Sequence, residues 1–204
     1  LFMSICDEMK NIEAAWGSAK QNNWVAEASR LAMVISEITA NRGPYSKGLR
    51  HIRETLEFVN NREAPLEPYA ELQLCLQLVR LSHRVMDADA MGAAIDRCDQ
   101  LSESIFDDES RVLLLLFKAR YSYLRADQQM RAAYVEQAVT LSREHGLRTL
   151  YSEMLHEYAN VHRYGELWHP ALSEAINIMR VDGDSFRLAK TLGTMGHLLS
   201  VRQE

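Results

Sequence analysis

The chain has 204 residues, of which 47% are hydrophobic and 25% are charged, a balance typical of a globular protein with a sizeable core. Its formal net charge of −5 argues against a nucleic-acid-binding surface, and its longest apolar run, Val112 to Phe117, is too short to cross a membrane. The N-terminus lacks a signal-peptide pattern and the three cysteines lack metal-type spacing, so we expect a cytoplasmic protein with buried thiols.

The first part of the chain is predicted to be helical. Residues 6–24 contain alanines and tryptophans but no residue suited to chemistry, so we interpret this stretch as a helix packed between others. Trp16, Trp24 and Trp168 are expected in the core or at helix interfaces. The next apolar residues recur at spacings of three and four, which lines one helical face: Leu49, Ile52, Leu56 and Val59. Period-two alternation is missing, so we predict no sheet.

Stop and start signals divide the chain into about ten helices. The strong signals combine glycine, proline or a capping acid, and they lie at Gly43-Pro44, Pro65 to Pro68, Asp107-Asp108, His145-Gly146 and Asp182-Gly183-Asp184. Weaker breaks lie at Gln21-Asn23, Asp87-Asp89, Ala126-Gln128 and Tyr164-Glu166. In the second half of the chain the breaks of each kind recur roughly every 38 to 40 residues, which is typical of a two-helix repeat.

The residues within these units resemble the tetratricopeptide pattern, in which small residues lie where two helices approach closely. The best copy is Leu155, Tyr158, Ala159 and His162, followed by Ala171, Ala175 and Ile178; Leu192, Met195, Gly196 and Leu199 repeat its first half. The resemblance implies an all-α, antiparallel helix-pair solenoid with a right-handed superhelical twist. We expect a single helical-repeat domain over residues 1–204, with N-terminal helices in 1–64 and tetratricopeptide-like repeats in 65–204.

A second resemblance concerns the N-terminal helices and bacterial STAND-type (NB-ARC/LuxR-like) signal-transduction ATPases. The residues similar to that family are Glu8, Asn11, Ala14, Ala15, Trp16, Arg30, Leu31, Ala32, Gly43, Gly48 and Leu56. The resemblance implies a sensor region whose repeats bind an inducer or partner and control an attached ATPase or transcription-regulatory module. No Gly-x4-Gly-Lys-Ser/Thr loop occurs here, so we expect no cofactor in this segment. Because Leu1 is not a methionine, we expect a fragment of a longer protein.

Patterns that suggest chemistry have simpler structural explanations. His156-Glu157 resembles part of a zinc-protease helix, but His162 is six residues away, on a different side of the helix. Residues 106–109 (Phe-Asp-Asp-Glu) superficially resemble the acidic motif of helical terpene synthases, but two acids before an apolar helix are the expected N-cap. No Ser/His/Asp or Cys/His signature stands out. We therefore expect no catalytic residue, no metal site and no enzymatic activity.

In tetratricopeptide-like stacks, the first helices of the pairs line a concave groove. Applying the repeat register to this chain predicts the groove-facing residues His83, Arg120, Tyr123, His156, Asn160, Arg163 and His197. Arginine, tyrosine and asparagine at these positions favour a protein or peptide partner or a small anionic inducer, although each residue also suits an ordinary solvated surface. Packing against neighbouring domains of the same chain and homo-oligomerisation are further partner classes, whereas nucleic acid and membrane are not expected. The alternative is a free-standing scaffold that binds a partner peptide or helix.

Overall fold

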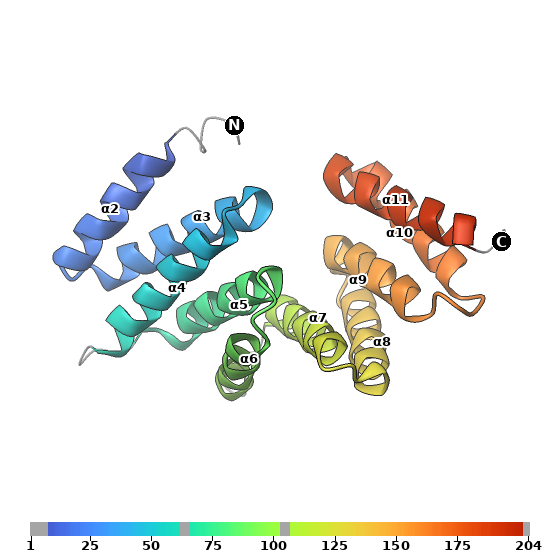
Figure 1. The fold of residues 1–204 in the computed structure, drawn as a ribbon, viewed down its shortest axis with the longest axis horizontal. Helices are drawn as coiled ribbons and strands as arrows, with labels where there is room; N and C mark the ends of the chain where they lie inside the picture. The colour runs from blue at the N-terminus through green and yellow to red at the C-terminus, as the bar shows by residue number, and fades with distance from the viewer. Residues whose placement is uncertain (1–7, 62–65, 103–106, 202–204) are drawn as a thin grey trace. The chain divides into compact units, whose positions relative to one another are not determined.

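The computed structural model describes residues 8–61, 66–102 and 107–201, and the regular structure in these ranges is entirely α-helical (Figure 1). The predicted all-α fold of about ten helices is confirmed. The ten helices within these ranges are α2 (Met9–Gln21), α3 (Val25–Arg42), α4 (Tyr45–Asn60), α5 (Pro68–Arg84), α6 (Ala88–Ser102), α7 (Asp108–Leu124), α8 (Gln128–Glu144), α9 (Arg148–Val161), α10 (Trp168–Asp182) and α11 (Ser185–Val201).

The predicted breaks coincide with the boundaries between these helices, apart from Pro65, which lies outside the described residues. The reasons are local. The Asp107 carboxylate accepts hydrogen bonds from the backbone N–H groups of Glu109 and Ser110, so it caps α7 as expected. Gly146 and Gly183 have φ values of 64° and 72°, the left-handed conformation that ends a helix at low steric cost in glycine. The helix boundaries therefore follow from capping and turn chemistry.

Neighbouring helices pack in adjacent pairs, as a helical-repeat solenoid requires. The pairs α5/α6, α7/α8 and α9/α10 each consist of two helices joined by a short connection (Figure 1). The first helices begin at residues 68, 108, 148 and 185, so the repeat is about 40 residues long, close to the predicted spacing. The contacts divide the chain into two compact units, residues 1–106 (unit 1) and 107–204 (unit 2), and this boundary lies within the predicted repeats.

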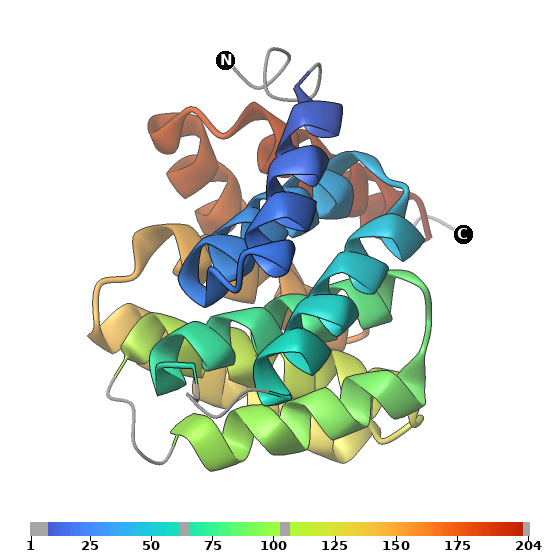
Figure 2. The ribbon, with the colours of Figure 1, turned by 90° about the vertical axis from the view of Figure 1, so that its left-hand side faces the viewer.

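In unit 1, α2 lies against α3 (Figure 2). It is also hydrogen-bonded to α4. The Trp16 indole N–H donates to Thr55 Oγ1 at 2.9 Å, and the Trp16 ring meets the His51 ring edge-on, with centroids 4.5 Å apart. Trp16 is therefore an interface anchor, as expected, and Trp168 is buried in unit 2. Trp24 is different: 55% of its surface is exposed, because it occupies the turn before α3 rather than a helix interface.

Helices α3, α4 and α5 approach one another closely at Gly48. A Cβ atom at this position would overlap Thr39 Oγ1 of α3 and lie 3.1 Å from Leu81 Cδ1 of α5. Thr39 and Leu81 are both fully buried, so neither has open space to move into. Glycine at residue 48 is therefore a packing requirement of unit 1.

In unit 2, small residues let α9 and α10 approach each other, as the repeat pattern predicts. Ala159, Ala171 and Ala175 lie in one buried cluster together with Trp168. The next helix, α11, is much less enclosed, since only its Thr191 and Leu198 side chains are buried. Most of the α11 surface is consequently open, and part of it faces α9.

Candidate ligand-binding pocket

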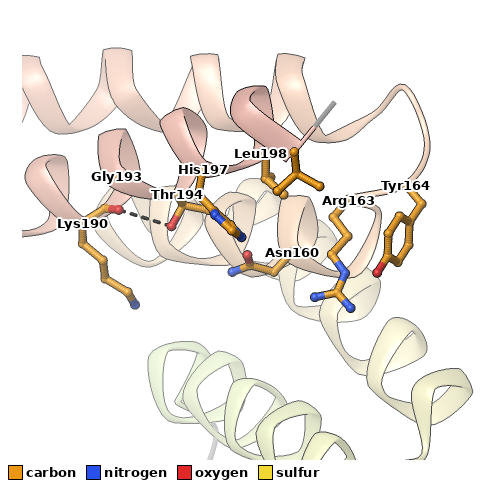
Figure 3. A pocket seen from close by; sticks show the side chains of 9 residues that line it. Asn160, Arg163, Tyr164, Lys190, Gly193, Thr194, His197 and Leu198 are labelled. Carbon is orange, nitrogen blue, oxygen red and sulfur yellow. Dashed lines mark hydrogen bonds between the residues drawn. The ribbon is translucent and has the colours of Figure 1, made fainter. Parts of the chain in front are cut away.

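Unit 2 contains a pocket of about 520 Å³ between the C-terminal part of α9, the loop that follows it, and α11 (Figure 3). Cavities of several hundred Å³ are of the size that holds small ligands. The residues that line it are Asn160, Arg163, Tyr164, Lys190, Gly193, Thr194, His197, Leu198 and Val201.

Helical spacing explains why α11 contributes most of this lining. Lys190, Thr194, His197 and Val201 are spaced by four, three and four residues, so they lie along one face of α11. Gly193 lies on the same side of the helix, and a Cβ atom added there would have no heavy atom within 4 Å. One face of α11 therefore forms one wall of the pocket; it is polar at Lys190, Thr194 and His197 and has no side chain at Gly193.

Three polar side chains of the pocket lining have no direct partner among the described residues. Among the residues that the structure describes, Asn160, Lys190 and His197 have no side-chain hydrogen bond or ion pair. The Tyr164 hydroxyl has no hydrogen-bond partner in that part of the chain either, and the Tyr164 ring lies 4.8 Å from the Arg163 guanidinium. The lining includes two cations and no carboxylate, so its potential favours an anion.

A buried histidine contacts the pocket lining through Thr194. His156 is 4% exposed; its Nδ1 hydrogen-bonds Thr191 Oγ1 at 3.0 Å, and its Nε2 lies 3.4 Å from Oγ1 of the pocket residue Thr194. Burial, followed by the positive charge of Lys190, holds the pKa of His156 below its ordinary value of 6.5. The imidazole is thus neutral at pH 7 and fixes α11 against α9.

Replacing His156 with asparagine is expected to cost about 1 kcal/mol of unfolding free energy at neutral pH, since a buried hydrogen bond is lost. Because the folded-state pKa of His156 is lowered, the wild-type chain should lose stability as pH falls below 6.5, and this loss should be smaller in H156N. Urea unfolding between about pH 7.5 and pH 5 measures both effects. The exposed His169→Asn change should behave like the wild type; a constant gap between wild type and H156N across this range would contradict the expectation.

A second cluster of charged side chains in unit 2 forms ion pairs between α7 and α9. The Arg120 guanidinium of α7 contacts carboxylate oxygens of Glu153 at 3.1 Å and of Glu157 at 2.9 Å, both on α9. Arg131 and Arg187 add longer contacts of 3.9 Å to Glu157 and 3.7 Å to Glu153. We call this cluster the α7–α9 ion network. Its arginines pair with carboxylates of the neighbouring repeat.

The structure brings three of the seven predicted groove residues, Asn160, Arg163 and His197, into the pocket, and it places His156 directly beneath. Arg120 belongs to the α7–α9 ion network instead. The remaining two do not line the pocket: Tyr123 is half-exposed with the Arg131 guanidinium 4.6 Å from its ring, and His83 is a partly buried residue of unit 1.

The predicted set does not include the other six lining residues, which are Tyr164, Lys190, Gly193, Thr194, Leu198 and Val201. The spacing of Lys190, Thr194 and His197 along one helical face was the signal that could have found the α11 wall. Residue 106 of the acidic motif lies outside the described residues.

No protein-family model matches the chain, and no curated protein matches it significantly. None of the helices in the described ranges is long and apolar enough to span a membrane. Within those ranges, no group of three or more His, Cys, Asp and Glu side chains is placed to hold a metal ion.

Proposed function

We propose that this chain is a non-catalytic binding domain that recognises its ligand in the pocket between α9 and α11. The observation that carries the proposal is the contrast between two sets of polar groups. Those of the α7–α9 ion network are paired with one another, whereas Asn160, Lys190 and His197 converge on a pocket without partners among the described residues. Polar groups that converge without partners on a concave site are suited to a ligand.

The same contrast favours a small ligand over an extended peptide. A peptide along the first helices would need a continuous row of available side chains, but Arg120, Glu153 and Glu157 already pair between α7 and α9. The available groups are confined to one end of this surface. A scaffold that binds a peptide or helix is therefore the second candidate.

We further propose that the domain is the sensor region of a cytoplasmic STAND-type regulator, on the strength of the resemblance at residues 8–56. An inducer that prefers one packing of the repeats would shift the population of states of the attached ATPase. In the intact protein, the bound ligand should then change nucleotide exchange and oligomeric state. A ligand that binds but changes neither would leave a binding domain without this regulatory role.

The binding role can be tested by filling the pocket from a position that does not hold the fold together. Gly193→Phe places a ring on the pocket side of α11, where an added Cβ meets no atom within 4 Å. Gly196→Phe is the matched control: it is also an exposed α11 glycine with open space around its Cβ, but it does not line the pocket. Both changes should preserve or raise helix stability, because glycine is a poor helix former.

Equilibrium dialysis of the 204-residue chain against the small-molecule fraction of a bacterial cell extract, followed by mass spectrometry, provides the measurement. We expect at least one compound to be enriched by the wild type and by G196F and to fall to background with G193F. An identical set of compounds retained by G193F, or no compound retained by any form, would contradict the proposal.

A further inference from the structure

We infer that the ligand of the α9–α11 pocket is an organic anion with one carboxylate or phosphate group and a compact apolar part. This inference depends on the proposed binding function and specifies the chemistry of that site. It is carried by three features of the pocket: the signs of the charges, the donors around them and the apolar end of the wall.

The first feature is charge. Lys190 and Arg163 are the charged residues of the lining, and no aspartate or glutamate is among them. The Lys190 ammonium has neither a hydrogen bond nor an ion pair with any residue that the structure describes. The Lys190 charge acts on the Glu157 carboxylate, where it helps to lower the pKa, but the two form no direct ion pair. A ligand carboxylate or phosphate would give Lys190 a direct ion pair, whereas a ligand ammonium would be repelled by Lys190 and Arg163.

The second feature is the arrangement of hydrogen-bond donors. Figure 3 shows the Arg163 guanidinium and the His197 ring turned toward Asn160, so that side chains from α9, its following loop and α11 face a common space. The Asn160 amide offers two N–H donors and the His197 ring offers N–H donation, both suited to the oxygens of an anionic group. Donors from three separate segments can contact more than one oxygen of the same group.

The third feature is the apolar end of the α11 wall. Leu198 follows His197 directly, Val201 lies about one turn further along α11, and both line the pocket together with Tyr164. These groups provide surface for a hydrocarbon or aromatic moiety but no further charge. A bare inorganic anion would leave this surface in contact with water, so we expect the apolar part to contribute to affinity.

Probes that share one skeleton separate these contributions. The probes are 3-phenylpropanoate, 3-phenylpropyl phosphate, 3-phenylpropanol, 3-phenylpropylamine and inorganic phosphate, each titrated into the ¹⁵N-labelled 204-residue chain by NMR. We expect both organic anions to bind at least tenfold more tightly than the alcohol and the amine, with shifts at pocket residues. The stronger of the two identifies the preferred head group. Equal affinity for the alcohol or amine would overturn the anion assignment, and equal affinity for inorganic phosphate would overturn the apolar part.

Lys190→Gln tests the role of the charge without disturbing a contact that holds the fold. K190Q should weaken both organic anions at least fivefold and leave the alcohol unchanged, whereas the exposed Arg180→Gln change on α10, away from the lining, should alter neither. Unchanged anion affinity in K190Q would overturn the inference. Failure of every probe, with compounds from the extract still excluded by G193F, would reject this ligand class and leave the binding function standing.

Discussion

Gly48→Ala is expected to destabilise unit 1 by about 3 kcal/mol, at the upper end of the usual cost of overpacking. The added methyl group would overlap Thr39 Oγ1 and press on Leu81 Cδ1 at 3.1 Å. Thr39 is held by hydrogen bonds from its hydroxyl to the carbonyls of Ile35 (2.8 Å) and Ser36 (3.1 Å), so its side chain is not free to rotate away. Urea unfolding monitored by circular dichroism and tryptophan fluorescence measures the change.

The matched control is Gly17→Ala in α2, where an added Cβ meets nothing within 4 Å. Alanine should stabilise that helix by roughly 0.5 to 1 kcal/mol, because it has a higher helix propensity than glycine. In a Thr39→Ala background, G48A should cost at least 1 kcal/mol less, since the overlapping hydroxyl is gone. If G48A and G17A had the same effect, three helices would not meet at residue 48 as described.

Arg120→Met is expected to lower the unfolding free energy of unit 2 by about 2 to 3 kcal/mol at neutral pH. Removing one partner of a largely buried ion pair leaves carboxylates without compensation, which typically costs about 3 to 5 kcal/mol. The cost should be lower here because Arg131 and Arg187 still lie 3.9 Å and 3.7 Å from the two carboxylates. Arg111→Met is the control: Arg111 is half-exposed and, among the described residues, pairs with Asp108 alone, at 3.5 Å, so its removal should cost less than about 0.5 kcal/mol.

The pH dependence of R120M separates lost charge pairing from lost packing. Burial alone would raise the pKa of Glu157, but the Arg120 charge and hydrogen bond outweigh it, so the pKa lies below the ordinary 4.5. The stabilisation from this pair is therefore present above pH 4.5 and is lost as pH falls through the lowered pKa. The gap in unfolding free energy between wild type and R120M should narrow as pH falls below about 5. A gap that stays constant down to about pH 3.5 would assign the effect to packing.

The helix boundaries were predictable because their causes are local. A capping carboxylate such as Asp107 and a left-handed glycine such as Gly146 act within a few residues of their position in the sequence. The close approach of α9 and α10 was predictable for a related reason, since Ala159 and Ala175 recur at repeat positions. The exposure of Trp24 was not, because residue type alone favours burial and only the geometry of the turn decides otherwise.

The site was predictable only in part, because the register specifies a face but not which groups on it pair together. Arg120 has the residue type and register of a ligand-binding side chain, yet its partners Glu153 and Glu157 lie 33 and 37 residues later, about one repeat along. His156 and Thr191 show the same relation at a separation of 35 residues. Separations near the repeat length therefore carry information on pairing between first helices. The position of Tyr164 depends on the path of a loop, which no periodicity reports.

The sparse burial of α11 gives the pocket a thermodynamic consequence. Among the described α11 side chains, only those of Thr191 and Leu198 are buried, whereas the pocket is built jointly by α9 and α11. A ligand seated there would contact both helices and would stabilise the associated arrangement in proportion to its occupancy. Local opening of α11 and release of the ligand would then be one linked equilibrium, so that ligand concentration sets how often this helix detaches.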